Sequence, residues 1–197
     1  MSRLRGASAG ALAVSIIFLT LLTACATVAL APPDRAYTGR FAVTTALAEQ
    51  RENVSGRFGL EIRGLQQILE LSSPLGTTVA RIEIDPGGAR AIGARMQEVH
   101  GADADALTEQ LLGWPLPVSG LADWIEGQPV ASRVARIERD GGRIVLLEQD
   151  GWTIRLPEYF EGKVGVTERP RRLVLERAAA ANTPSVVLRL IVDEPGG

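Results

Sequence analysis

Residues 143–156, RIVLLEQDGWTIRL, decide the fold class of this chain. Two strand-like runs, Arg143–Gln149 and Trp152–Leu156, flank the dipeptide Asp150-Gly151. Because Asp-Gly supplies the positive φ angles of a tight primed turn, this stretch predicts an antiparallel hairpin.

The same pattern recurs along the chain. Apolar and polar residues alternate through Phe58, Leu60 and Ile62, and again through Ala80, Ile82 and Ile84, as on strands with one wet face. Further strands are expected at Leu173–Glu176 and Val186–Val192, and turns at Asp85-Pro86-Gly87-Gly88, Asp140-Gly141-Gly142 and Asn182-Thr183-Pro184. About ten strands joined by short links predict an antiparallel sheet that curls or closes.

Two helices interrupt the strands. Ala106, Leu107, Leu111 and Leu112 are spaced as on one helix face, after Asp103 or Asp105 as the cap and before Gly113-Trp114-Pro115. A second short helix begins at Ser119, holds Leu121, Trp124 and Ile125, and ends by Gly127 and Pro129. The sequence therefore predicts a mainly β protein whose inserted helices cover one face of the sheet.

Composition excludes several classes of protein. Of the 197 residues, 46% are hydrophobic and one is cysteine, which excludes a disordered or disulfide-rich chain. The formal net charge of −2 argues against nucleic acid as a partner, because phosphate binding needs a basic surplus.

Catalytic chemistry has little support. His100 is the single histidine, so catalytic triads and histidine metal clusters lack the residues they need. Gly87-Gly88 and Gly141-Gly142 lack the spacing and the lysine of a phosphate loop. We expect no enzymatic activity, no metal and no cofactor.

The N-terminal segment has a pattern unlike that of the strands. Arg3 and Arg5 precede the apolar run from Ala11 to Ala24, as in a secretory signal peptide. The uncharged run continues to Pro33, which is long enough for an uncleaved anchor of about 20 residues. Leu22-Thr23-Ala24-Cys25, however, fits a bacterial lipobox, in which the cysteine is lipidated and becomes the new N-terminus.

Lipidation at Cys25 predicts a signal peptide over residues 1–24 and a lipidated N-terminus and tether over residues 25–36. Removing residues 1–24 takes away two arginines and no acid, so the net charge becomes −4. Ala26 stands where an acidic residue would indicate inner-membrane retention in enteric bacteria, which by analogy points to the outer membrane.

The interior of the curled sheet has two interpretations. Its apolar side chains either pack as a solid core or leave a ligand cavity, as in lipocalin-like barrels. Composition alone leaves both open.

Several segments, in this order, resemble the LolB family of outer-membrane lipoprotein receptors. They are Gly39-Arg40-Phe41, Ser73-Pro74-Leu75-Gly76-Thr77-Thr78, Leu112-Gly113-Trp114-Pro115-Leu116-Pro117, Leu121-Ala122-Asp123-Trp124-Ile125, Gln149-Asp150-Gly151-Trp152 and Arg172-Leu173-Val174-Leu175. Together with the lipobox, they make the resemblance specific over nearly all of residues 37–194.

The resemblance implies an open, incomplete antiparallel β-barrel, covered by two or three short helices, with a hydrophobic cavity in a single lipoprotein-binding domain over residues 37–197. It implies a monomer in the outer membrane that takes acylated lipoproteins from the periplasmic carrier LolA and passes them to outer-membrane lipid without an energy source. The acyl-chain cavity would be lined by Phe58, Leu60, Ile62, Leu69, Leu71, Ile82, Ile84, Trp124, Ile144, Leu146, Trp152, Ile154, Leu173 and Leu175.

Leu75 lies between Pro74 and Gly76, which mark a turn. On sequence alone it is either an exposed tip or part of the core. The resemblance favours an exposed membrane-insertion loop of Pro74, Leu75 and Gly76. The alternative function is a structural or assembly lipoprotein with a solid core that binds other envelope proteins.

Overall fold

The computed structural model describes residues 31–95, 97–161 and 168–194. The predicted signal peptide and Cys25 lie outside this range. Residues 33–197 form one compact unit.

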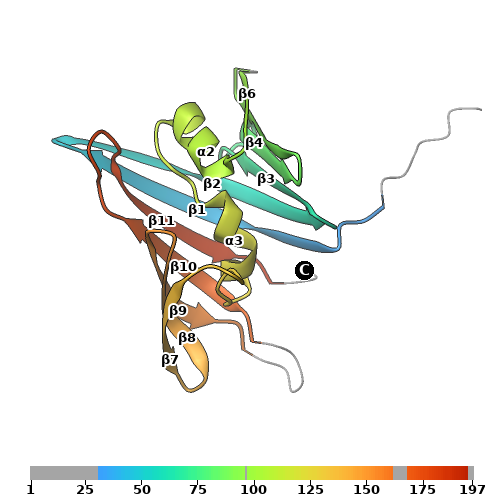
Figure 1. Cartoon of the computed structure of the whole chain (residues 1–197), viewed down its shortest axis with the longest axis vertical. Coiled ribbons are helices and arrows are strands. Elements are labelled where there is room, and N and C mark those ends of the chain that lie inside the picture. Colours follow the sequence, from blue (N-terminus) through green and yellow to red (C-terminus); the bar gives the residue numbers. More distant parts are fainter. Residues whose placement is uncertain (1–30, 96, 162–167, 195–197) are drawn as a thin grey trace, which may run out of the picture. The chain divides into compact units, whose positions relative to one another are not determined.

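Eleven strands in the described part of the chain form one antiparallel sheet (Figure 1). The strands are β1 (Arg35–Leu47), β2 (Gln50–Arg63), β3 (Gln66–Ser72), β4 (Thr78–Asp85), β5 (Gly88–Gly93), β6 (Glu98–Gly101), β7 (Ala135–Asp140), β8 (Arg143–Gln149), β9 (Trp152–Tyr159), β10 (Pro170–Arg177) and β11 (Ser185–Val192). The prediction of a mainly β fold with inserted helices is confirmed. The first strand begins at Arg35 and so includes the last two residues of the predicted tether.

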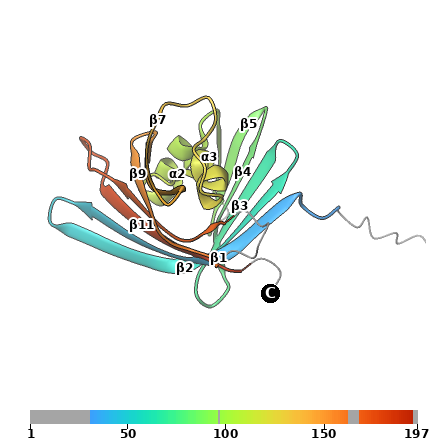
Figure 2. The same ribbon diagram turned by 90° about the horizontal axis from the view of Figure 1, so that it is seen from below.

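Strand order explains why the sheet stays open. The order is β6-β5-β4-β3-β2-β1-β11-β10-β9-β8-β7, so the first and last strands pair in the middle, with Gly39 opposite Val192. β6 and β7 are the two edges of the sheet. The segment between them carries α2 (Ala104–Leu112) and α3 (Val118–Ile125), which lie over the concave face (Figure 2).

The turns follow the predicted chemistry. Asp150 and Gly151 have φ angles of 54° and 76°, and Gln149 pairs with Trp152 across them, which confirms the primed hairpin turn. The loop between β7 and β8 also has positive φ at both Gly141 and Gly142.

Two neighbouring aspartates accept hydrogen bonds at the starts of the two helices. Asp103 is the cap of α2, and its Oδ1 accepts hydrogen bonds from the backbone N–H groups of Asp105 and Ala106 at 2.9 and 3.2 Å. Asp105 instead reaches α3, accepting from the N–H and the hydroxyl of Ser119 at 3.0 and 3.1 Å. α3 has no side-chain cap at Pro117, so Asp105 supplies the carboxylate near its first turn.

Glycines allow tight curvature in the centre of the sheet. Gly39 lies opposite Phe58, and Gly56 lies opposite Phe41, on neighbouring pairs of β1 and β2. A Cβ atom would lie 2.2 Å from the Ile191 carbonyl oxygen at Gly39 and 2.0 Å from the Ser72 carbonyl oxygen at Gly56. Only glycine permits so close an approach of neighbouring strands, and the phenyl rings cover the space that the glycines leave.

An irregularity in β8 changes which side chains face inward. Glu138 pairs with Leu146 but Arg139 pairs with Ile144, so β8 holds one extra residue. The structure therefore places Leu147, and not Leu146, on the concave face. Leu146 lies opposite Arg155 and is only partly buried.

Candidate functional site: the concave face and its groove

The concave face and the helices above it share one apolar cluster. The predicted cavity residues in this cluster are Phe58, Leu60, Ile62, Leu69, Leu71, Ile82, Trp124, Ile144, Trp152, Ile154, Leu173 and Leu175. Ile84 is partly buried and packs against it. Tyr37, Phe41 and Val43 of β1 and Val186, Leu188, Leu190 and Val192 of β11 belong to the same cluster. The alternation in Val186–Val192 was the signal that could have added the β11 residues to the predicted lining.

A buried glutamine joins α3 to the sheet. The side chain of Gln149 is 3% exposed, and its Oε1 accepts from the Trp124 indole N–H at 2.9 Å and the Val130 backbone N–H at 2.8 Å. Its Nε2 donates to the Val130 carbonyl at 3.1 Å. Sequence reasoning missed this role, because a strand glutamine beside a turn is usually exposed.

A second contact holds the end of α3 against β1. The Tyr37 hydroxyl donates to Glu126 Oε1 at 2.6 Å, and the Arg169 guanidinium lies 5.4 Å from the centre of the Tyr37 ring. Burial, followed by the bond to Glu126, raises the pKa of Tyr37 to about 12. Tyr37 therefore stays protonated and keeps donating throughout the physiological range of pH.

The concave face opens in a groove beside the end of α2. This apolar groove holds about 360 Å³ and is lined by Phe41, Val54, Leu71, Val79, Leu111, Leu112 and Trp114, with Glu52, Arg95 and Gln97 as its polar members. Its volume lies in the range of about 300–1,000 Å³ typical of sites for small ligands. The lining is chemically suited to an acyl chain with a polar group at one end.

An exposed loop connects two strands whose ends line this groove. Residues 73–77 connect β3 to β4, and the loop is closed by a hydrogen bond from Ser73 N–H to the Thr77 carbonyl at 2.8 Å. Gly76 has a φ of 86°, and Leu75 is 95% exposed. Leu71 and Val79, near the two ends of the loop, both line the groove. In Figure 2 the green loop between β3 and β4 projects from the side of the sheet that faces away from the helices.

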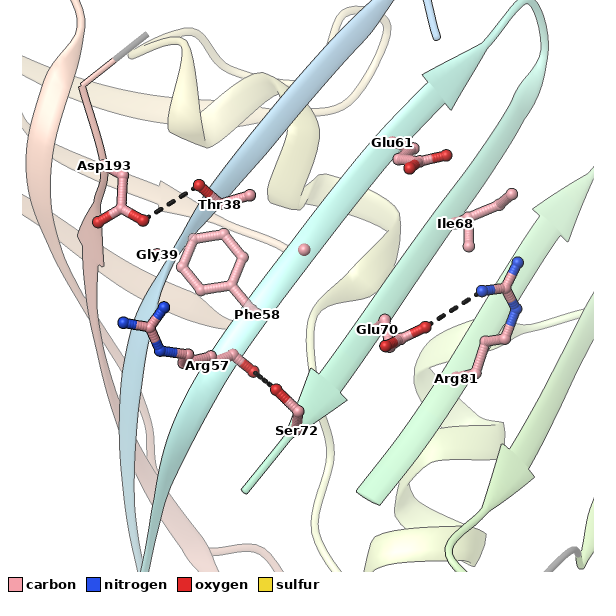
Figure 3. A pocket seen from close by; sticks show the side chains of 11 residues that line it. Thr38, Gly39, Arg57, Phe58, Glu61, Ile68, Glu70, Ser72, Arg81 and Asp193 are labelled. Carbon is pink, nitrogen blue, oxygen red and sulfur yellow. Dashed lines mark hydrogen bonds and ion pairs between the residues drawn. The ribbon is translucent and has the colours of Figure 1, made fainter. Parts of the chain in front are cut away.

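The convex face has a hollow of different character (Figure 3). It holds about 370 Å³ over Gly59, where an added Cβ atom would have no neighbour within 4 Å. Ile68 is its apolar floor, and the charged lining consists of Arg57, Glu61, Glu70, Arg81 and Asp193. Charges of both signs make this hollow a poor site for an acyl chain.

His100, the single histidine of the chain, lies at the edge of the sheet. The His100 side chain is 67% exposed, and its Nε2 lies 3.0 Å from Glu98 Oε1 at the sheet edge. Among the described residues, no group of three or more His, Cys, Asp or Glu side chains is placed to hold a metal ion. In the same part of the chain, none of the helices has the length and apolar character needed to cross a membrane.

Comparisons with known proteins find one matching family model, several similar sequences and a similar solved structure. The family model described as "Outer membrane lipoprotein LolB" matches residues 34–194. The outer-membrane lipoprotein LolB of Cupriavidus pinatubonensis is 37% identical over 185 residues, covering 88% of this chain and 88% of the relative. That of Bordetella petrii is 37% identical over 183 residues, covering 89% of this chain and 88% of the relative. A crystal structure of a LolA superfamily protein from Nitrosomonas europaea aligns with a TM-score of 0.45 at 13% identity, over 82% of this chain and 86% of that one.

Proposed function

Because the chain belongs to the LolB family of outer-membrane lipoproteins, we propose that it receives acylated lipoproteins and places them in the outer membrane, to which its own lipid anchor attaches it. A periplasmic carrier of the LolA type supplies the cargo. The function requires no catalytic group in this chain.

The observation that carries the proposal is the apolar groove together with the exposed Leu75, whose loop connects two strands that line the groove. Each methylene group taken out of water gains about 0.8 kcal/mol, so a free acyl chain does not readily cross the periplasm. A protein that offers an apolar groove beside a membrane-seeking leucine can take the chain from a carrier and release it into a bilayer. The transfer lowers the free energy of the acyl chain and needs no energy source, because the bilayer binds the chain most favourably.

Cargo binding involves the cluster of core residues behind the groove. Trp124 and Ile125 are 1% and 0% exposed and fill the space between α3 and the sheet. An acyl chain longer than the groove therefore displaces α2 and α3 outward, with Phe58, Leu60, Leu69 and Ile82 among the side chains that it then meets.

The insertion loop is tested by Leu75→Glu. Since Leu75 is 95% exposed, the variant should unfold at the same temperature as the unchanged protein and accept lipoprotein from the carrier. It should fail to pass cargo to vesicles, because a carboxylate does not enter the lipid interface. Leu65→Glu is the matched control, since Leu65 is 82% exposed in the turn between β2 and β3, at the other end of β3. Normal delivery by Leu75→Glu would remove the insertion role.

The anchor is tested separately. Cys25→Ser should leave the precursor without lipid, because Cys25 is the single cysteine of the chain. Incorporation of labelled palmitate by this variant would contradict the lipobox assignment.

The packed cluster favours a second candidate, a structural lipoprotein with a solid core that binds other envelope proteins. A fluorescent apolar probe distinguishes the two. Saturable displacement of the probe by fatty acids supports lipoprotein transfer, whereas binding that fatty acids do not displace supports the structural function.

A further inference from the structure

Three exposed arginines form a row on the convex face, and we call Arg40, Arg57 and Arg189 the arginine row. Arg40 of β1 lies directly opposite Arg57 of β2. On the other side of β1, Arg40 lies opposite Ile191 and Ala42 lies opposite Arg189, so Arg40 and Arg189 are diagonal neighbours. Side chains in these positions have Cβ atoms about 5 Å and about 7–8 Å apart.

Like charges directly opposite one another destabilise a sheet. Among residues 31–95, 97–161 and 168–194, no carboxylate forms an ion pair with any member of the row. Four carboxylates border a hollow beside Arg40, those of Glu158, Glu161, Asp193 and Glu194. Glu158 pairs with Arg171 and Arg172, and Asp193 accepts from the Thr38 hydroxyl. Glu61, Glu70 and Asp193 likewise line a hollow with Arg57, and none of them is within ion-pair distance of it. The row is therefore a run of arginines without ion pairs on a chain of net negative charge.

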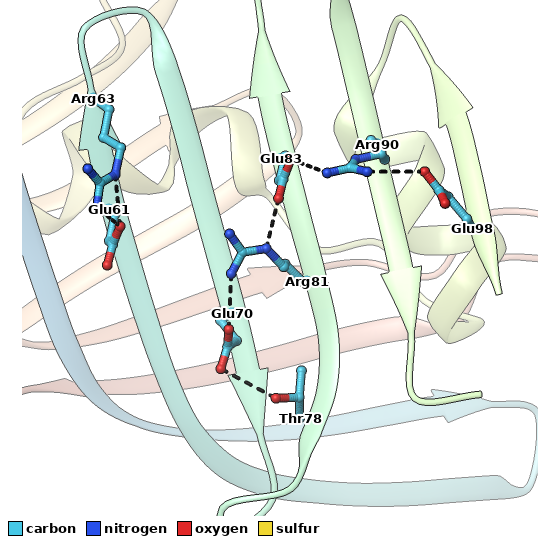
Figure 4. Close-up of polar contacts among 8 residues, drawn as sticks. All are labelled: Glu61, Arg63, Glu70, Thr78, Arg81, Glu83, Arg90 and Glu98. Atoms are coloured by element: carbon cyan, nitrogen blue, oxygen red, sulfur yellow. Dashed lines mark hydrogen bonds and ion pairs between the residues drawn. The ribbon is translucent and has the colours of Figure 1, made fainter. Parts of the chain in front are cut away.

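On strands β3 to β6 of the same face, by contrast, the arginines Arg81 and Arg90 form ion pairs (Figure 4). There Arg81 bridges Glu70 and Glu83, and Arg90 bridges Glu83 and Glu98, at N–O distances of 2.6–3.3 Å. We call this set the ion-pair ladder. Because the ladder neutralises its arginines across four strands, the unpaired state of the arginine row is a local feature and does not hold for the whole face.

The row lies beside the Leu75 loop. Arg57 pairs with Ser72, the last residue of β3 before the loop, and the Ser72 hydroxyl donates to the Arg57 carbonyl at 3.4 Å (Figure 3). The loop projects from the convex side of the sheet, the side on which the row is exposed (Figure 2). Leu75 and the arginines thus present an apolar tip flanked by positive charge to the same partner.

An apolar tip with flanking basic residues matches the surface of an anionic bilayer. Guanidinium groups bind phosphate oxygens in a bidentate manner, and each basic residue near an anionic membrane contributes about 1 kcal/mol of attraction. We propose that Arg40, Arg57 and Arg189 bind the phosphate head groups of anionic phospholipids while Leu75 enters the apolar layer. This proposal rests on the delivery function described above and names the lipid chemistry that the delivering surface recognises.

The test uses the full lipidated chain in vesicles, first without cargo or carrier and then with the carrier added. Phenylglyoxal, which modifies accessible arginines, is applied to protein in phosphatidylcholine vesicles with and without phosphatidylglycerol, and each site is quantified by mass spectrometry. Arg40, Arg57 and Arg189 should react about fivefold more slowly with phosphatidylglycerol present, and high salt should remove the difference. Arg136 and Arg139 of β7 are the internal controls and should react equally in both vesicles.

Equal reactivity of the row in both kinds of vesicle would overturn the proposal. Protection that appears only after addition of the carrier would also overturn it, since the row would then bind an acidic protein surface.

A delivery assay separates this proposal from the proposed function. Arg40→Gln/Arg57→Gln should slow cargo delivery to phosphatidylglycerol vesicles about 5- to 30-fold, and Arg40→Lys/Arg57→Lys should restore most of the rate. Arg136→Gln/Arg139→Gln makes the same change in charge at the far edge of the sheet and should deliver normally. If the arginines are protected but the unchanged protein delivers no cargo, the proposed function fails and the lipid site stands.

Discussion

The concave and convex faces of the sheet are built from the same strands, yet they differ in almost every property. On β2, Phe58 and Leu60 point into the cluster under the helices, whereas Arg57 and Gly59 lie on the convex face. The concave side chains are held by packing and by hydrogen bonds such as those of Gln149 and Tyr37. The convex side chains are held by exposed ion pairs, or are left unpaired. Because the buried apolar side chains lie on the concave face, we expect most of the stability to come from that face, which leaves the other free to carry charge for binding.

The largest expected effect is on the concave face. Trp124→Ala removes a side chain that is 1% exposed and leaves a cavity between α3 and β8, so we expect a loss of about 3–5 kcal/mol in the free energy of unfolding. Urea denaturation measures this loss. Leu65→Ala, at an 82% exposed site, should change the same quantity by less than about 0.5 kcal/mol. Equal losses in the two variants would contradict the comparison.

The next effect contrasts two glycines on β2. At Gly56 a new Cβ atom would lie 2.0 Å from the Ser72 carbonyl oxygen, so Gly56→Ala should lower the free energy of unfolding by about 1–3 kcal/mol or more. At Gly59 a new Cβ atom has no neighbour within 4 Å, so Gly59→Ala should be neutral or raise stability by up to about 1 kcal/mol. Thermal unfolding of both variants measures these changes in stability. A Gly56→Ala variant as stable as the unchanged protein would show that β2 and β3 separate easily at this position.

The ion-pair ladder should give a smaller effect with a defined dependence on pH. Hydrogen bonds from Arg81 and Arg90 hold the pKa of Glu83 below its usual value. A lowered pKa adds stability that is present above the unfolded value and is lost as pH falls through the folded value. Glu83→Gln should therefore be less stable than the unchanged protein at neutral pH, by less than Gly56→Ala, and the difference should shrink in acid and in high salt. A difference that grows in acid would contradict this assignment.

The smallest effect has the opposite sign. Burial raises the pKa of Asp105 above its usual value, although its bonds with Ser119 oppose the shift. The folded state then holds a proton that the unfolded state releases, so stability falls as pH rises from the ordinary carboxyl pKa of 3.8 through the raised folded value. Chemical denaturation across this range should show the unchanged protein losing stability relative to Asp105→Asn. Parallel profiles of stability against pH for the two proteins would contradict the raised pKa of Asp105.

Local patterns sufficed to predict much of this fold. Asp150-Gly151 has the φ angles that a primed turn requires, and Asp103 caps the helix that the spacing of Leu107 and Leu111 indicates. These features depend on residues a few positions apart, where turn chemistry and side-chain periodicity act directly. The exposure of Leu75 could not be predicted from local pattern alone. Pro74 and Gly76 indicate a turn, but they do not determine whether its tip folds back onto the sheet.

By itself, the sequence determined the alternating strands, the two helices, the turn chemistry, and the family to which the chain belongs. The tertiary structure decided which distant residues meet. The extra residue in β8 places Leu147 inward in place of Leu146, and only pairing with β7 reveals it. Arg40 and Arg57 face each other because of the β1–β2 register, and Arg189 joins them because the first and last strands pair. Local propensity carries no information about these contacts, since register and strand order are set by burial of the whole concave face.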